Sequence, residues 1–427
     1  INGQRTSSTN FTRDGINVQD NFIRTGGFVQ DRPSVDDTGE FTVTTQNAGA
    51  ELGGGGSAQI QLVTPRGGSE FHGAGYLYNR NSEFAANTFA NNATGTPRPF
   101  LNRNQFGGKV GGPFPLPGFG SGSPQFWRDK MYFFVNYERF LLRQTTSKNT
   151  TVLLPQFRDG TFSYTGLDGN PYTVNVLSGA GLTGPIPGSS GGVLGVDPTI
   201  QSRVLSRLPS SGNGSFSNGG LSQAFRFNQA NNDTRDAVTT RFDLDFNDSN
   251  SVYFVYKYNK NADDRTDIDG TFNVTPVNTQ GGPTPGYLLS YTTVLGSNFT
   301  SEFRGAYNQS DPFFNEDPNF PTDFLIGGLS FMTNPQSGFQ AQGRKTDQYT
   351  FQNNSSYSWG NHTFRFGLDF NAQRLDTETN FNRVGIFNIT GTANPNTPGL
   401  DGSLFPGGIS ATNRGRADAL RYMLGGI

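Results

Sequence analysis

The segment from His362 to Gln373 alternates apolar and polar residues without interruption. Phe364, Phe366, Leu368 and Phe370 fall on one side, and the residues between them are polar or glycine. A period of two residues is that of an extended strand with one apolar and one polar face. Such strands build either a soluble sandwich, whose polar face meets bulk water, or a membrane-spanning barrel, whose apolar face meets lipid.

Regular alternation recurs at 130–152, 235–246, 250–260 and 299–309, and less regular segments resemble these. Together they predict about nine antiparallel strands, at 71–80, 102–111, 130–152, 235–246, 250–260, 286–295, 299–309, 346–358 and 362–376. If the apolar faces touch lipid, the lipid-facing residues are Phe133, Val135, Phe242, Leu244, Phe254, Phe303, Phe364, Phe366, Leu368 and Phe370.

The connections between these strands are alternately short and long. The short ones have hairpin-turn compositions, at 247–249, 296–298 and 359–361. The long ones are 153–234, 261–285, 310–345 and 377–410. Short turns on one rim and long loops on the other are typical of an outer-membrane barrel, whose long loops lie outside the cell. All the long loops lie on the same rim only if 130–152 is one unbroken strand, because splitting it would move the 153–234 loop to the opposite rim.

Helices are expected only within or after the long loops. Asp197 followed by Pro198 is a helix-start signal, and it predicts a short helix that runs to about Leu208. The tail from Ala417 to Leu424 fits either a small helix or the beginning of another strand.

Composition excludes several classes of protein. Only 33% of residues are hydrophobic and the mean hydropathy is −0.54, so no apolar run reaches the ~20 residues of a membrane-spanning helix. A net charge of −2 gives no basic field for nucleic acid. Cysteine is absent, which removes disulfides, thiol catalysis and cysteine-based zinc sites.

No constellation of side chains points to catalysis. His72 and His362, the two histidines of the chain, fall on separate predicted strands. Aspartates in the 261–285 loop could offer oxygen ligands to Ca²⁺, but their spacing matches no EF-hand and favours a solvated loop: Asp263, Asp264, Asp267 and Asp269. We therefore expect no catalytic residue, no metal site, no cofactor and no enzymatic activity.

Short segments in the first third of the chain carry a family resemblance. They are Asn2-Gly3-Gln4-Arg5, Asp14-Gly15, Glu40–Val43, Ile60–Thr64, Ser69–Gly73, Asn104–Gly108, Asp129-Lys130 and Asn136-Tyr137-Glu138. In this order they resemble the TonB-dependent outer-membrane receptors, in particular the Oar-like group. The resemblance covers residues 1–142, and beyond Gln144 it is one of pattern only.

The resemblance implies an all-β fold: a plug domain followed by a transmembrane β-barrel of ~22 strands. Since about nine strands fit here, we expect an internal fragment. Residues 1–70 would be the C-terminal part of the plug, and residues 71–427 the first part of an open barrel. The implied function is uptake of an extracellular substrate across the bacterial outer membrane, driven by the proton-motive force through the TonB complex. The implied partners are outer-membrane lipid, TonB and an unidentified substrate.

Two other functions remain open at this stage, a passive porin-like channel and a soluble β-rich adhesin; a secreted hydrolase would need an acid/base pair. In the plugged-barrel reading, charged residues of the plug and of the polar strand faces are candidates for plug–lumen contacts. They are Arg5, Arg13, Glu51, Arg66, Glu138, Arg241, Asp243, Asp245, Glu302, Arg304, Arg365 and Asp369.

Overall fold

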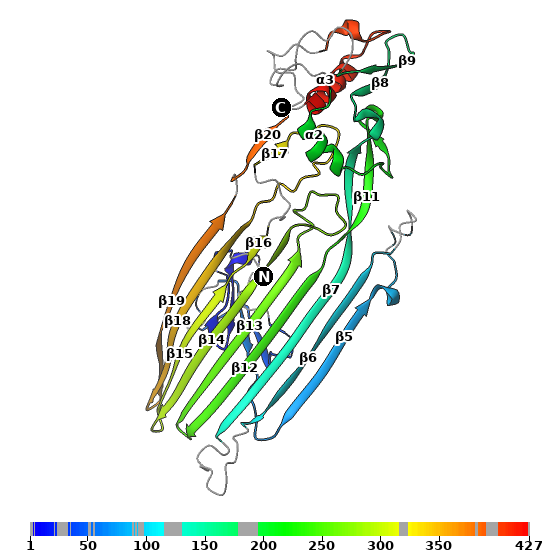
Figure 1. Cartoon of the computed structure of the whole chain (residues 1–427). Helices are drawn as coiled ribbons and strands as arrows, with labels where there is room; N and C mark the ends of the chain where they lie inside the picture. Colours follow the sequence, from blue (N-terminus) through cyan, green and yellow to red (C-terminus); the bar gives the residue numbers. More distant parts are fainter. Residues whose placement is uncertain are drawn as a thin grey trace.

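The computed structural model contains one large antiparallel sheet, whose nine long strands are neighbours in chain order (Figure 1). They are β5 (His72–Asn81), β6 (Leu101–Pro113), β7 (Met131–Leu153), β12 (Asp233–Asn247), β13 (Asn250–Asp264), β14 (Thr279–Leu295), β15 (Phe299–Ser310), β18 (Gln342–Trp359) and β19 (His362–Thr379). The structure describes the chain except residues 1–2, 4, 21, 24–32, 35, 50–52, 54–55, 88, 90–91, 93–97, 115–129, 178–194, 316–322, 381–382, 390–399 and 426–427.

Strand β7 is the longest element and continues well beyond its neighbours. Its first half pairs with β6 and β12, and its second half pairs with β11 (Ser222–Ala230). The register is the same on both sides of the break at 231–232, because Ala230 faces Thr145 and Asp233 faces Leu142. Strands β11 and β12 therefore form one long partner for β7, and this ribbon rises above the rest of the sheet (Figure 1).

A small four-stranded sheet precedes the large one, and we call it, together with the described residues that join its strands, the N-terminal sheet. Its order is β2 (Ile16–Asn17), β1 (Thr9–Arg13), β4 (Ala58–Val63) and β3 (Glu40–Thr44). Strands β1 and β4 are parallel and the other pairs are antiparallel. This sheet lies against one face of the large sheet (blue in Figure 1) and touches strands from β6 to β18. The large sheet thus curves around it, and the face that it touches is the inner face.

The opposite, outer face carries a row of tyrosines. Strand register places Tyr256, Tyr287, Tyr307 and Tyr349 side by side across β13, β14, β15 and β18, with ring centroids 5.1, 6.2 and 5.1 Å apart. Trp359 ends β18 ten residues beyond Tyr349. Ten residues span ~33 Å along a strand, or ~25 Å at a tilt of about 40°, which is the height of the apolar band of an outer-membrane barrel.

The long loops gather above the sheet into a compact unit, which we call the cap. It comprises 154–177, 195–221, 324–332, 383–389 and 400–425, with further elements β8 (Thr161–Thr165), β9 (Pro171–Asn175), α2 (Pro198–Arg203), β10 (Phe216–Ser217), β17 (Phe324–Gly327), β20 (Gly385–Asn388) and α3 (Ala411–Gly425). One hydrophobic core joins its distant segments, including Leu153, Ile200, Ile326 and Leu420. The short hairpin turns lie at the end of the sheet opposite the cap (Figure 1).

The structure confirms the all-β fold with a curved antiparallel sheet, and all nine expected strands are present, with β7 unbroken. Asp197 caps α2 by accepting hydrogen bonds from the Thr199 and Ile200 amides, at 2.7 and 3.2 Å. Two expectations were wrong in detail. β14 begins at Thr279, inside the expected 261–285 loop, and β18 begins at Gln342, inside the expected 310–345 loop. Among the described residues, no helix is long and apolar enough to cross a membrane.

Candidate functional site

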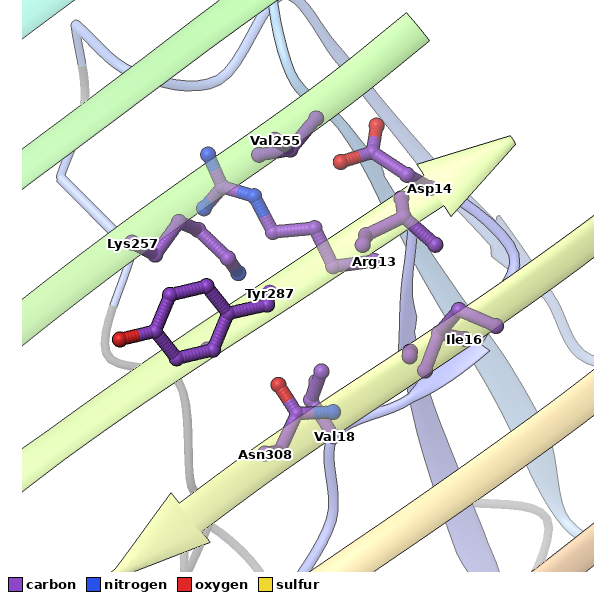
Figure 2. Close-up of a pocket in the computed structure, with 11 residues that line it drawn as sticks. Arg13, Asp14, Ile16, Val18, Val255, Lys257, Tyr287 and Asn308 are labelled. Carbon is purple, nitrogen blue, oxygen red and sulfur yellow. The ribbon is translucent and has the colours of Figure 1, made fainter. Parts of the chain in front are cut away.

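The inner face meets the N-terminal sheet through a small apolar contact surrounded by polar ones. Ile16 packs on Val255 and Leu288, which point inward from β13 and β14. Beside them is a cavity of about 20 Å³, room for about one water molecule. Figure 2 shows the residues around it, among them Arg13, Asp14, Ile16, Val18, Val255, Lys257 and Asn308.

Asp37 is a deeply buried link between the N-terminal sheet and the large sheet. Its carboxylate forms an ion pair with Arg13 (Nη2–Oδ2 3.1 Å), and the two side chains are 4% and 1% exposed. The same Oδ2 accepts a hydrogen bond from the Thr239 hydroxyl of β12, at 2.8 Å. Arg13 also donates to the Thr64 hydroxyl at 3.1 Å and to the Asp37 carbonyl. A buried charge is thereby paired within the N-terminal sheet and tied to the wall.

A cluster of charges joins the end of β4 to β12. Arg241 donates to the Thr64 carbonyl at 2.8 Å and pairs with Asp243 at 2.8 Å. Arg66, two residues after Thr64, pairs with Asp245 and lies 3.5 Å from Asp243. Asp243 is 4% exposed, so both arginines compensate a carboxylate that is largely removed from water.

Four further polar contacts connect the two sheets, two on each side of this cluster. On the β6–β7 side, Lys109 pairs with Asp36 at 2.7 Å, and the Asn136 amide donates to the Ser34 hydroxyl at 3.1 Å. On the β18 side, Arg344 pairs with Asp20, and the Gln348 amide donates to the Asn17 carbonyl at 3.1 Å. The contacts therefore reach across most of the inner face.

Glu138 takes part in the wall rather than in this interface. It accepts hydrogen bonds from the Tyr76 hydroxyl at 2.9 Å and from the Gln105 amide at 3.0 Å. The Tyr76 ring crosses directly over Gly107, where a Cβ atom would lie 2.7 Å from the tyrosine oxygen. Glycine at this position lets the tyrosine reach Glu138 and join β5 to β7.

The remaining candidate contact residues are distributed differently. Glu302 and Arg304 form a pair at 2.6 Å on β15, with the Arg304 guanidinium against Gly15. Asp369 accepts a hydrogen bond from Gln352 at 3.2 Å. The Arg5 and Arg365 side chains are exposed and form no hydrogen bond or ion pair with another described residue. Glu51 lies outside the described residues.

The ten residues expected to face lipid all lie on the outer face. Strand pairing sets Phe133, Phe242 and Phe254 opposite one another, and Phe303 opposite Asn353, which faces Leu368. The β19 side chains are the most open, from 50% exposure at Phe364 to 61% at Leu368. The same face carries Val135, Leu244, Phe366 and Phe370.

The histidines and loop aspartates are not assembled into a reactive site. His72 on β5 and His362 on β19 lie at opposite edges of the sheet. Asp269 accepts from the Thr271 and Val277 amides, Asp267 pairs with Arg265 at 2.6 Å, and Asp264 accepts from the Asn232 amide. In the described part of the chain, no three acidic or histidine side chains are grouped as metal ligands.

Sequence reasoning missed several residues of the interface. On the large sheet these are Lys109, Asn136, Thr239, Arg344 and Gln348. Asn136 and Thr239 share strand parity with the predicted inner-face charges Glu138 and Arg241 and were therefore detectable, whereas Arg344 lies in the expected 310–345 loop. On the N-terminal side they are Asn17, Asp20, Ser34, Asp36 and Asp37. Most of these fall in irregular segments, where no periodic pattern indicates which side chain points outward.

The cap presents its own polar contacts outside the sheet. Arg203, at the end of α2, donates to the Asp323 carboxylate at 2.5 Å and stacks over the Phe324 ring, 4.1 Å from its centroid. The Arg203 guanidinium lowers the pKa of Asp323 to about 2. The contact links α2 to the loop before β17.

Comparison with solved structures supports the barrel architecture. The outer membrane transporter YddB from Escherichia coli matches with a TM-score of 0.54 at 13% identity, over 91% of this chain and 43% of that one. The siderophore receptor PirA from Acinetobacter baumannii (TM-score 0.47, 11% identity, 88% and 41%) and a mutant of the ferric enterobactin receptor PfeA from Pseudomonas aeruginosa (0.48, 11%, 87% and 42%) are more distant. The chain thus spans less than half the length of each.

No curated protein matches the sequence. A family of known domains does match, over residues 63–420, and this stretch begins at the end of β4 and includes all nine long strands. Membership also places the protein in the outer membrane, in agreement with the apolar outer face between the tyrosine row and Trp359. The chain belongs to the outer membrane beta barrel domain family.

Proposed function

We propose that this chain is part of a TonB-dependent outer-membrane receptor, and that the N-terminal sheet is part of its plug. The observation that carries the proposal is the position of that sheet, on the inner face of the curved wall and in contact with strands from β6 to β18. A passive pore has no need of a folded unit in its lumen, whereas a gated transporter requires one.

The chemistry of the interface suits a movable plug. Most links are ion pairs and hydrogen bonds, such as Arg66 with Asp245 and Asp37 with Thr239. Water can replace these hydrogen-bond and ion-pair partners when the plug shifts, whereas separating a large apolar interface would expose apolar surface to water. Among the described residues, the apolar contact centres on Ile16 with Val255 and Leu288. Energy transmitted by TonB could therefore displace the plug without unfolding the wall.

Recognition of the substrate would be the task of the cap. Binding residues are commonly carried by loops that a rigid scaffold holds in place. Here the loops are folded around their own core, at the end of the sheet away from the short hairpin turns. The substrate class stays open: iron chelates, glycans, peptides and proteins all fit an outer cap of this kind.

The test is the ion conductance of the native gene product in planar bilayers. We expect little current from the intact protein and a large, steady current from a variant that lacks residues 3–64. Expression of the native gene product in cells with and without TonB should then separate energised uptake of a solute from its passive diffusion. A large constitutive current from the intact protein would favour a porin-like channel. Recovery in the aqueous phase without detergent would favour a soluble adhesin.

A further inference from the structure

The contact between the N-terminal sheet and β18 differs in kind from the other contacts. Two inner-face residues of β18, Arg344 and Gln348, contact residues 17–20, and Thr346 lies between them on the same face of the strand. Gln348 donates to the Asn17 carbonyl and Arg344 pairs with Asp20. We call this contact, formed by residues 17–20 with Arg344, Thr346 and Gln348, the β18 seam.

The β18 seam contains buried polar atoms that lack a protein partner. Thr346 and Gln348 are 0% exposed and Gln19 is 1% exposed. Yet Thr346 Oγ1, Gln348 Oε1, Gln19 Oε1 and Arg344 Nε form no hydrogen bond within the described part of the chain. Buried polar groups are nearly always satisfied, by protein or by ordered water. Four such atoms on these two adjoining segments therefore require bound solvent.

On the opposite side of the N-terminal sheet, which faces β6, β7 and β12, the buried polar groups find their partners within the protein. Asp37 is held by Arg13 and Thr239, while Arg241 is held by Asp243 and the Thr64 carbonyl. Among the described side-chain atoms in the contacts with β7 and β12, Asn136 Oδ1 is the one without a hydrogen-bond partner. Strand β15 lies between this side and β18, and there Arg304 Nε also lacks a partner. The contacts with β6, β7 and β12 thus form an anchor, and the β18 seam is its weaker counterpart.

We propose that the β18 seam is a hydrated channel, in which water molecules bridge Gln19, Thr346 and Gln348, and that the N-terminal sheet separates from the wall along this seam while the anchor holds. The hydration is inferred from the contacts alone, whereas the separation of the N-terminal sheet from the wall rests on the proposed function. A solute would then pass between β18 and the N-terminal sheet. Because amide and hydroxyl groups and the Arg344–Asp20 ion pair line this path, it would favour polar solutes that can replace the water.

Thiol labelling tests the hydration directly, because the chain contains no cysteine. Gln348→Cys and Thr239→Cys both place a thiol on the inner face at a position no more than 2% exposed. We expect a small cationic methanethiosulfonate reagent to modify Gln348→Cys at least tenfold faster in isolated outer membranes. Equal rates, or faster reaction at Thr239→Cys, would overturn the proposal.

A second measurement covers the case in which the Gln348 variant does not fold. In a high-resolution crystal structure of the unmodified protein, we expect ordered water within hydrogen-bond distance of Gln19 Oε1, Thr346 Oγ1 and Gln348 Oε1. Well-ordered side chains without such water would overturn the hydration.

Disulfide locks test the direction of opening. Asn17→Cys with Gln348→Cys would close the β18 seam, and Ser34→Cys with Asn136→Cys would close the anchor at the 3.1 Å contact. The probe is potassium chloride current in planar bilayers under rising urea. We expect the oxidised seam pair to keep the current closed to higher urea than the oxidised anchor pair, and reduction to abolish the difference. The reverse order, or no difference, would overturn the direction of opening but leave the labelling result and the proposed plug intact.

Discussion

The Asp37→Ala substitution should loosen the N-terminal sheet without affecting the wall. It removes one partner of the buried pair with Arg13, which is 2% exposed and would keep its bonds to the Thr64 hydroxyl and to the backbone carbonyl of residue 37. Breaking a buried pair from one side costs ~3–5 kcal/mol, and the bonds that Arg13 keeps favour the lower end. About 3 kcal/mol corresponds to a ~100-fold increase in the population of the open sheet.

Hydrogen exchange of the native protein measures this population. We expect amides of β1 and β4 to exchange ~100-fold faster in Asp37→Ala and ~10-fold faster in Thr239→Val, which removes one hydrogen bond to a carboxylate at ~1.5 kcal/mol. Glu40→Ala removes an exposed carboxylate from the adjacent strand β3 and serves as the control. If Asp37→Ala exchanged within threefold of the native protein, the pair would not hold the sheet.

Three other predictions test the outer face and the cap. Phe366→Arg should block membrane assembly, at ~2–4 kcal/mol near the midplane, whereas Asn371→Arg on the inner face should assemble, as judged by heat-modifiable migration in gels. Ile200→Ala, at a fully buried cap position, should cost ~2–5 kcal/mol and expose the cap to protease while the sheet stays resistant. Because the folded-state pKa of Asp323 lies below its ordinary value, its pair with Arg203 stabilises the cap above about pH 4 and is lost as the pH falls towards 2. The thermal transition of the cap should fall more over that range in the native protein than in Asp323→Asn, and equal losses would contradict the role of the pair.

Strand alternation was enough to predict the long strands of the sheet, because each strand has one apolar and one polar face. It failed at the beginning of β14, where Gly281, Gly282, Pro283 and Pro285 read as a loop. Pairing with β13 extends through these residues, while pairing with β15 ends at Gly286. One side of the strand is therefore free of ladder bonds from 282 to 285, and proline is tolerated there.

The tertiary arrangement of the cap could not be predicted, because its core has no local period. Leu153, Ile200, Ile326 and Leu420 come from four segments that are far apart in the sequence. Only the tertiary fold brings them together. Strand β11 was missed for the same reason, since its partner is the far end of β7 rather than an adjacent hairpin strand.

The candidate site was predictable on one side only. Arg241 and Asp243 share a strand face by parity, and that face is the one that contacts the N-terminal sheet. Asp20 and Asp37 lie in irregular segments, where the direction of a side chain depends on the path of the chain rather than on a repeat. Sequence thus identifies the wall of the interface better than the unit that it encloses.

The central claim is that the apolar faces of the strands touch hydrocarbon while their polar faces line an aqueous interior. Spin labels on single cysteines at Leu368 and Asn371, in the assembled protein in bilayers, test it most directly. We expect the Leu368 label to collide mainly with oxygen, which is concentrated in lipid, and the Asn371 label mainly with a water-soluble nickel chelate. Similar collision ratios at both positions, or preference for the nickel chelate at Leu368, would contradict the claim.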